Sequence, residues 1–160
     1  MGHHLAQQPH CLEQPQGAQR DGVVWIPEML PRSEVISLLT ASTVFACPSV
    51  YEPLGIVNLE AMACELPVVA TATGGIPEVV VPGETGWLVP IEQVQDGTGT
   101  PVDPEKFVSD LAGALTDAVS NRERARAMGL AGRARAVDHF SWESIGDKTM
   151  AVYQDVLGRA

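Results

Sequence analysis

The sequence predicts an α/β protein in which a parallel β-sheet is covered by helices on both faces. Short apolar runs rich in β-branched residues alternate with segments of helical periodicity. These runs are continuous instead of alternating with polar residues, as expected for strands that are buried on both faces. Proline and glycine lie at many of the segment boundaries. Together, these observations favour strand–helix–strand units.

Four strands and three helices are expected in the first ninety residues. The predicted strands are Val23–Ile26, Thr43–Cys47, Pro67–Thr71 and Trp87–Val89. The predicted helices begin at Pro31, extend over Gly55–Cys64 and lie near Ile76–Val81.

Three longer helices are expected after a polar loop at Gln93–Thr100. Asp103, Asn121 and Ser141 are the expected caps of these helices. The first helix has an apolar face formed by Phe107, Leu111 and Leu115. The second is expected to carry a solvated basic face of Arg122, Arg124, Arg126, Arg133 and Arg135. The third is expected to pack in the core through Ile145, Thr149, Val152, Tyr153 and Val156.

Size, charge and cysteine content limit the number of domains and the possible partners. A chain of 160 residues is sufficient for one domain. Its formal net charge of -10 disfavours nucleic acid and anionic lipid as partners. No apolar run approaches the ~20 residues of a membrane-spanning helix, and no secretory signal begins the chain. Its three cysteines, an odd number, favour reduced thiols and a cytoplasmic location.

Residues 1–21 differ in composition from the rest and are expected to be a disordered leader or an artefact of the start codon. Residues 22–160 then form the folded domain. The leader contains His3, His4, His10 and Cys11, whose spacing matches no closed zinc site. We therefore expect no bound metal and no other cofactor.

The segment Pro48–Glu60 is the strongest candidate for a functional site. It passes from the end of a predicted strand through a tight loop into a helix, which is where open α/β sheets bind ligands. Gly55 allows a ligand to approach the backbone closely. The N–H groups of Leu54–Val57 are expected to point outward, where they suit an anion such as a diphosphate.

Glu52 and Glu60 lie on the two sides of this expected anion site. Four helical residues contribute ~6 Å and the loop residues add several more, so the carboxylates are expected roughly 10 Å apart, about the span from the sugar to the ribose of a nucleotide sugar. Glu52 is expected to hold sugar hydroxyls and Glu60 the ribose diol. Spacing alone is weak evidence, because Glu84 and Glu92 have the same separation.

Several linked motifs resemble glycosyltransferase family 4. They are Pro48-Ser49, Glu52-Pro53-Leu54-Gly55, Glu60-Ala61-Met62-Ala63, Pro67-Val68-Val69-Ala70, Thr73-Gly74-Gly75-Ile76-Pro77-Glu78 and Gly83-Glu84-Thr85-Gly86. The resemblance covers about Gly22–Ala160 and implies the GT-B fold, which has two Rossmann-like domains facing a cleft. This chain would be the C-terminal, nucleotide-sugar-binding half, truncated on its N-terminal side.

By this resemblance, transfer is retaining and independent of metal, with Glu52 as the catalytic residue. The implied donor-binding residues are Glu52, Pro53, Leu54, Gly55, Ile56, Val57 and Glu60, with Ile26 and Pro27 beside the base. The turn Thr73-Gly74-Gly75 is open to two interpretations, a tight turn or a ligand contact. The missing N-terminal domain would be needed for activity, so this fragment is expected to be inactive. Two central strands of the sheet would also be absent and leave an apolar face exposed, so the isolated chain is expected to be prone to aggregation.

The sequences of Trp25–Pro31 and Tyr51–Asn58 most resemble those of actinobacterial glycogen synthases. This resemblance implies ADP-glucose as donor and an α-glucan or sugar as acceptor. Two alternatives stay open: a non-catalytic nucleotide-sugar-binding remnant, and a mannosyl- or glucosyltransferase using a UDP- or GDP-sugar. A glycoside hydrolase with Glu52 and Glu60 as its acid/base pair is disfavoured, because such pairs usually come from separate strands.

Two departures from the family pattern are expected to affect stability. Glu65 stands where the family has a glycine in left-handed conformation. In the strand order 3-2-1-4-5-6, the four predicted strands would be the third to sixth. Val23–Ile26 would then have no neighbour, and Val44–Cys47 would be a bare edge.

Overall fold

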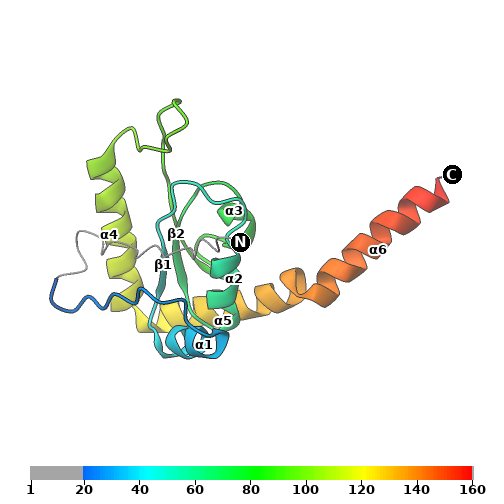
Figure 1. Ribbon diagram of the computed structural model, residues 1–160, viewed down its shortest axis with the longest axis horizontal. Coiled ribbons are helices and arrows are strands. Elements are labelled where there is room, and N and C mark those ends of the chain that lie inside the picture. The colour runs from blue at the N-terminus through cyan, green and yellow to red at the C-terminus, as the bar shows by residue number, and fades with distance from the viewer. Residues whose placement is uncertain (1–19, 160) are drawn as a thin grey trace, which may run out of the picture.

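The computed structural model describes residues 20–159, which form a three-stranded parallel sheet with helices on both faces (Figure 1). The strands are β1 (Phe45–Cys47), β2 (Val68–Thr71) and β3 (Gly86–Val89), in the order β1-β2-β3. The registers are parallel throughout, with Ala46 beside Val69 and Val69 beside Trp87. The α/β class with a parallel sheet and flanking helices is confirmed.

The two faces of β2 pack against different helices. The helices are α1 (Arg32–Ala41), α2 (Ile56–Ala63), α3 (Ile76–Val79), α4 (Pro104–Ser120), α5 (Arg122–Phe140) and α6 (Trp142–Gly158). Val68 and Ala70 are fully buried in one cluster with Met62 of α2. Val69 belongs to the cluster on the opposite face, with Ala118 of α4. Figure 1 shows the resulting three layers, with α2 and α3 across the sheet from α4.

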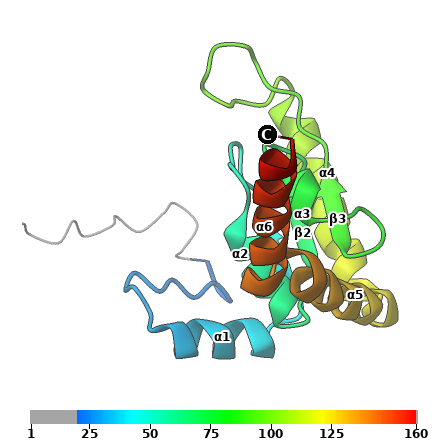
Figure 2. The same ribbon diagram turned by 90° about the vertical axis from the view of Figure 1, so that its right-hand side faces the viewer.

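Helix α5 packs against α2, and α6 follows α5 in the chain. Gly132 of α5 lies against Met62, where an added Cβ would be 3.3 Å from the Met62 Cγ. At Gly129, an added Cβ would overlap the backbone oxygen of Glu65. These small residues allow the two helices to approach closely. Beyond them, α6 projects away from the sheet (Figure 1), and in the view turned by 90° it lies in front of the sheet (Figure 2).

The predicted caps are confirmed. Asp103 accepts a hydrogen bond from the Lys106 backbone N–H at 2.9 Å, and Ser141 accepts one from Ser144 at 3.2 Å. Asn121 likewise caps α5. From Pro31 onward, each helix or strand boundary that was predicted lies within two residues of the observed one, which is the usual uncertainty of such boundaries.

The predicted strand at Val23–Ile26 is wrong. The structure has no strand at these residues, and Val24 is 84% exposed. A strand needs a neighbour to satisfy its backbone, and no strand in the described part of the chain pairs with this segment. β1 pairs only with β2 there and is therefore the expected edge. The leader expected at residues 1–21 lies, apart from Arg20 and Asp21, outside the described residues.

The basic face predicted for α5 is exposed at four of its five arginines, with Arg135 partly buried, but three of the five also make specific contacts that the prediction did not include. Arg124 forms an ion pair with Asp117 at 2.8 Å. Arg133 donates to the backbone oxygen of Ala63 at 2.5 Å, and Arg135 donates to the backbone oxygens of Glu78 and Val79. The last carbonyls of a helix have no hydrogen-bond partner within it. The guanidinium groups of Arg133 and Arg135 supply such partners at the ends of α2 and α3. Arg122 and Arg126 are exposed, as predicted.

The predicted core packing of α6 is also wrong. No residue of α6 is buried, and Val152, Tyr153 and Val156 are each 61% exposed. Helical periodicity identifies an apolar face but not what covers it. Because α6 extends beyond the sheet, nothing in the described part of the chain covers this face.

Candidate functional site

The loop that begins at Glu52 packs directly on the glycine turn after β2. Gly75 donates its N–H to the backbone oxygen of Glu52 at 3.0 Å. A Cβ on Gly74 would overlap that same oxygen, and a Cβ on Gly75 would overlap the backbone oxygen of Pro53. Gly74 also has a φ of +53°, which side-chain-bearing residues rarely adopt. Close packing against the Glu52 loop therefore accounts for both glycines of this turn.

Gly55 ends the loop and begins α2. Its φ is +90°, and its N–H donates to the Glu52 Oε1 at 3.1 Å. The prediction that the N–H groups of Leu54–Val57 are all free is therefore wrong at Gly55, because the Glu52 side chain folds back onto it. No side chain caps the start of α2, and Ile56 and Val57 are 63% and 44% exposed. The first turn of α2 is thus open to solvent beside Glu52.

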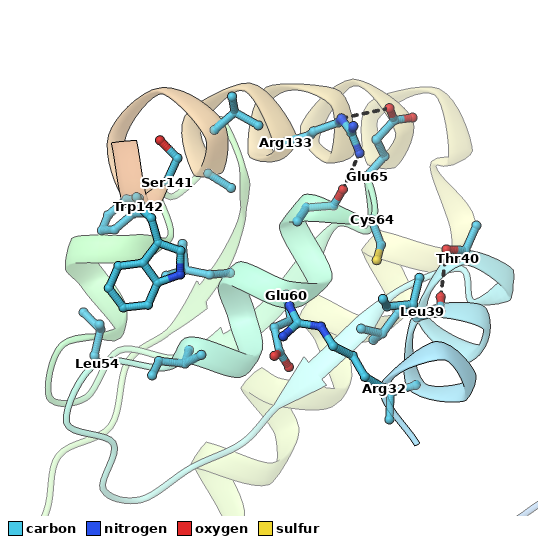
Figure 3. Close-up of a pocket in the computed structure, with 18 of the residues that line it drawn as sticks. Arg32, Leu39, Thr40, Leu54, Glu60, Cys64, Glu65, Arg133, Ser141 and Trp142 are labelled. Carbon is cyan, nitrogen blue, oxygen red and sulfur yellow. Dashed lines mark hydrogen bonds and ion pairs between the residues drawn. The ribbon is translucent and has the colours of Figure 1, made fainter. Parts of the chain in front are cut away.

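Glu60 faces a groove of about 990 Å³ between α1, α2 and the junction of α5 with α6 (Figure 3). Leu54 and Ile56 line the same groove. From α1, the Arg32 side chain extends toward Glu60. The remaining wall is largely apolar and includes Val35, Ile36, Leu39, Leu59, Phe140 and Trp142. A mostly apolar concavity with a few polar groups is typical of small-molecule sites.

The structure gathers only some of the predicted site residues around this groove. Leu54, Ile56 and Glu60 line the groove, whereas Glu52 is half-buried in the loop that packs on the glycine turn. Ile26 and Pro27 are exposed and are not among the lining residues. Their predicted place beside a base stays a prediction, as does the distance between the two carboxylates.

Two residues near the site were not predicted. Arg32 reaches the groove from the first turn of α1, and Asn58 of α2 is completely buried. A basic residue after a proline at a helix start is the only sequence signal for Arg32. Asn58 gave no signal, because a polar residue at the third position of a helix is usually exposed.

Nowhere between Arg20 and Arg159 do three His, Cys, Asp or Glu side chains gather closely enough to hold a metal ion. His3, His4, His10 and Cys11 lie outside this range. None of the helices in residues 20–159 is both long enough and apolar enough to span a bilayer.

Comparison with known proteins points to one family. The family model described as glycosyl transferases group 1 matches residues 16–135. The chain is 45% identical over 152 residues to the alpha-maltose-1-phosphate synthase of Mycolicibacterium smegmatis, which covers 95% of this chain and 37% of the relative. It is 40% identical over 131 residues to the MMP alpha-(1->4)-mannosyltransferase of Mycolicibacterium hassiacum, covering 81% of this chain and 28% of the relative.

A solved structure supports the same relationship. The crystal structure of Anabaena HepE in complex with UDP matches 78% of this chain and 30% of its own, with a TM-score of 0.62 and 26% sequence identity. The chain therefore spans about a third of the length of the relatives that it matches.

Proposed function

The chain belongs to the glycosyl transferases group 1 family, and from this premise we propose that it forms the nucleotide-sugar-binding part of a retaining hexosyltransferase. One observation carries the proposal. Glu60 faces a groove that also receives Leu54 and Ile56 from the uncapped start of α2. The groove therefore combines a carboxylate for a diol with a helix start suited to an anion.

We assign the diphosphate to the start of α2. The first N–H groups of a helix have no partner within it, and the helix dipole adds partial positive charge there. Ile56 and Val57 are exposed at this end.

We assign the ribose diol to Glu60 and the sugar hydroxyls to Glu52. The Glu52 carboxylate now accepts from Gly55, and donor binding would replace this contact with bonds from the sugar hydroxyls. Glu52 would thereby orient the sugar for attack from the face of the leaving group. Ile26 and Pro27 would border the base.

The names of the two relatives support retention. Maltose contains an α-glucosidic bond, and the mannosyltransferase is named for an α-(1→4) bond. Nucleotide-activated glucose and mannose carry α-linked diphosphates, so an α-linked product preserves the configuration. We infer ADP-glucose as the donor from the resemblance of Trp25–Pro31 and Tyr51–Asn58 to glycogen synthases. The HepE complex with UDP makes a uridine donor the alternative.

The acceptor is proposed to be a sugar or an α-glucan, bound by a second domain of the complete protein. The name of the maltose-1-phosphate synthase favours a phosphorylated sugar over a long glucan. We propose that transfer needs no metal. We place it in the cytoplasm, because Cys47 and Cys64 are free thiols in the structure.

Calorimetric titration of the complete protein tests the two carboxylate roles. Glu60→Ala is expected to weaken ADP about 10- to 100-fold, since it removes charge-assisted bonds to the ribose. Glu52→Ala is expected to leave ADP affinity nearly intact and to weaken ADP-glucose by a similar factor. Glu84→Ala, an exposed residue outside the groove, is the control. Equal weakening of free ADP by both site substitutions would contradict the assignment.

A further inference from the structure

Asn58 has a buried side-chain amide without a hydrogen-bond partner. The residue is 0% exposed, and neither its Oδ1 nor its Nδ2 has a hydrogen-bond partner within the described residues. Burying an unpaired amide costs free energy that an apolar side chain of the same shape would avoid. Packing alone therefore does not explain an asparagine at this position in α2.

The amide lies directly beneath the loop that carries Glu52. A Cβ added to Gly55 would lie 2.5 Å from the Asn58 Nδ2 and 3.5 Å from the Glu52 Cγ. Because Gly55 has no side chain, no side-chain atom of that residue separates the amide from the Glu52 side chain. The Glu52 carboxylate is at present oriented by the Gly55 N–H at 3.1 Å.

We propose that Asn58 is a positioning residue for Glu52 when the nucleotide sugar is bound. A diphosphate at the start of α2 competes for the backbone N–H groups there, including that of Gly55. The Glu52 carboxylate then needs another donor to keep it directed at the sugar hydroxyls. The Asn58 Nδ2, which has two N–H groups, supplies it, so its missing partner is provided by the bound state. This inference rests on the function proposed above.

Asn58→Leu in the complete protein tests this role, because leucine keeps the size of the side chain and removes the amide. We expect about tenfold weaker binding of ADP-glucose or UDP-glucose, whichever binds wild type more tightly, and unchanged binding of the matching diphosphate. Thr71→Val is the matched control. Thr71 is 0% exposed at the end of β2 and its Oγ1 also lacks a partner, so this change should leave both affinities unaltered.

A double-mutant cycle separates positioning from a general effect on the fold. If Asn58 acts through Glu52, Asn58→Leu causes no further loss of nucleotide-sugar affinity in the Glu52→Ala background, where the acceptor is gone. The same tenfold loss in that background would overturn the proposal, and so would wild-type affinity in the single variant. If the leucine variant does not fold, Asn58→Ala is used for the test, because alanine also removes the amide and adds no volume or charge to the buried site. Wild-type protein that binds neither diphosphate would instead overturn the proposed function, and this inference with it.

Discussion

Gly75 donates its backbone N–H to the backbone oxygen of Glu52 at 3.0 Å. This hydrogen bond connects the candidate sugar-binding loop to the turn after β2. The neighbouring Gly74 leaves no room for a Cβ against that same oxygen. The position of Glu52 is therefore set by a contact between two backbones. A side chain at Gly74 or Gly75 would separate them.

Gly74→Ala is expected to lower the free energy of unfolding by about 1–3 kcal/mol, because it adds a Cβ in a closed space at a φ of +53°. Gly113→Ala is the matched control. Gly113 lies in the exposed part of α4 with nothing within 4 Å of an added Cβ, so this change should raise stability by about 0.5–1 kcal/mol. Urea denaturation measures both. Equal effects of the two substitutions would show that the turn tolerates a side chain.

Arg135→Ala is expected to destabilise the protein by about 1–3 kcal/mol. The guanidinium group donates to Val79 at 2.9 Å and to Glu78 at 2.7 Å, and it lies 5.5 Å from the centre of the Phe140 ring. Its removal would leave two helix-terminal carbonyls unpaired. Arg126→Ala on the same helix should change stability by less than about 0.5 kcal/mol, since Arg126 is exposed. Thermal unfolding of both variants distinguishes them.

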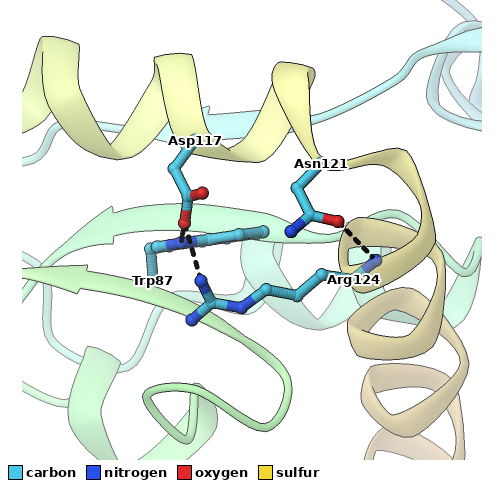
Figure 4. Close-up of polar contacts among 4 residues, drawn as sticks. All are labelled: Trp87, Asp117, Asn121 and Arg124. Atoms are coloured by element: carbon cyan, nitrogen blue, oxygen red, sulfur yellow. Dashed lines mark hydrogen bonds and ion pairs between the residues drawn. The ribbon is translucent and has the colours of Figure 1, made fainter.

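Trp87, Asp117 and Arg124 connect β3, α4 and α5 (Figure 4). The Trp87 Nε1 donates to the Asp117 Oδ2 at 2.7 Å, and Arg124 donates to that oxygen at 2.8 Å while lying over the indole ring. We predict a coupling energy of about 0.5–1.5 kcal/mol between Trp87→Phe and Asp117→Ala, because phenylalanine keeps the ring but loses the donor. Additive effects in urea denaturation would argue against this hydrogen bond.

Local signals in the sequence predicted most of the fold. Buried parallel strands such as β2 are continuous apolar runs, and caps such as Asp103 depend on a few neighbouring residues, so both were predictable. Failures occurred where the outcome depended on a distant partner. The apolar face of α6 and the run at Val23–Ile26 have the right patterns, but no partner covers or pairs with them among the described residues.

The candidate site was predictable to a similar extent. Glu52, Gly55 and Glu60 were proposed as site residues from a strand–loop–helix pattern and a family resemblance, and their roles stay predictions. The Glu52 contact with Gly55, and the approach of Arg32 to Glu60, depend on side-chain conformation and on the placement of α1. Neither is encoded in residue spacing. The unpaired amide of Asn58 could be recognised only once its burial was known.

The complete protein is expected to transfer glucose with retention and to be unaffected by EDTA. Charge on a departing nucleotide diphosphate must be stabilised by bound metal or by preorganised donors, and the start of α2 offers such donors. NMR of the product anomer from ADP-glucose and UDP-glucose, with and without chelator, measures this. Glu52→Gln should lower turnover as well as affinity, because orientation of the sugar is needed for attack. An inverted product, or activity lost in EDTA and restored by Mn²⁺, would exclude this mechanism.

Glu65 adopts the left-handed conformation that was predicted for it, with a φ of 60°. It follows the end of α2, where its N–H bonds to the Met62 backbone oxygen at 2.9 Å. A side chain in this conformation costs roughly 1–2 kcal/mol. Its carboxylate lies 3.7 Å from the Arg133 Nε, but both side chains are half exposed, so this ion pair contributes at most about 1 kcal/mol.

Glu65→Gly and Glu65→Gln together separate these two effects. Both remove the ion pair with Arg133, but only glycine also relieves the backbone at φ 60°. The glycine variant is therefore expected to be more stable than the glutamine variant by about 1 kcal/mol, after allowance for the greater freedom of glycine in the unfolded chain. Raising the salt concentration should bring the free energy of unfolding of wild type closer to that of the glutamine variant, because salt screens the exposed ion pair. The difference in free energy of unfolding between the two variants should stay unchanged. Urea denaturation at two ionic strengths measures all three proteins, and equal stabilities of the two variants would show that Glu65 is unstrained.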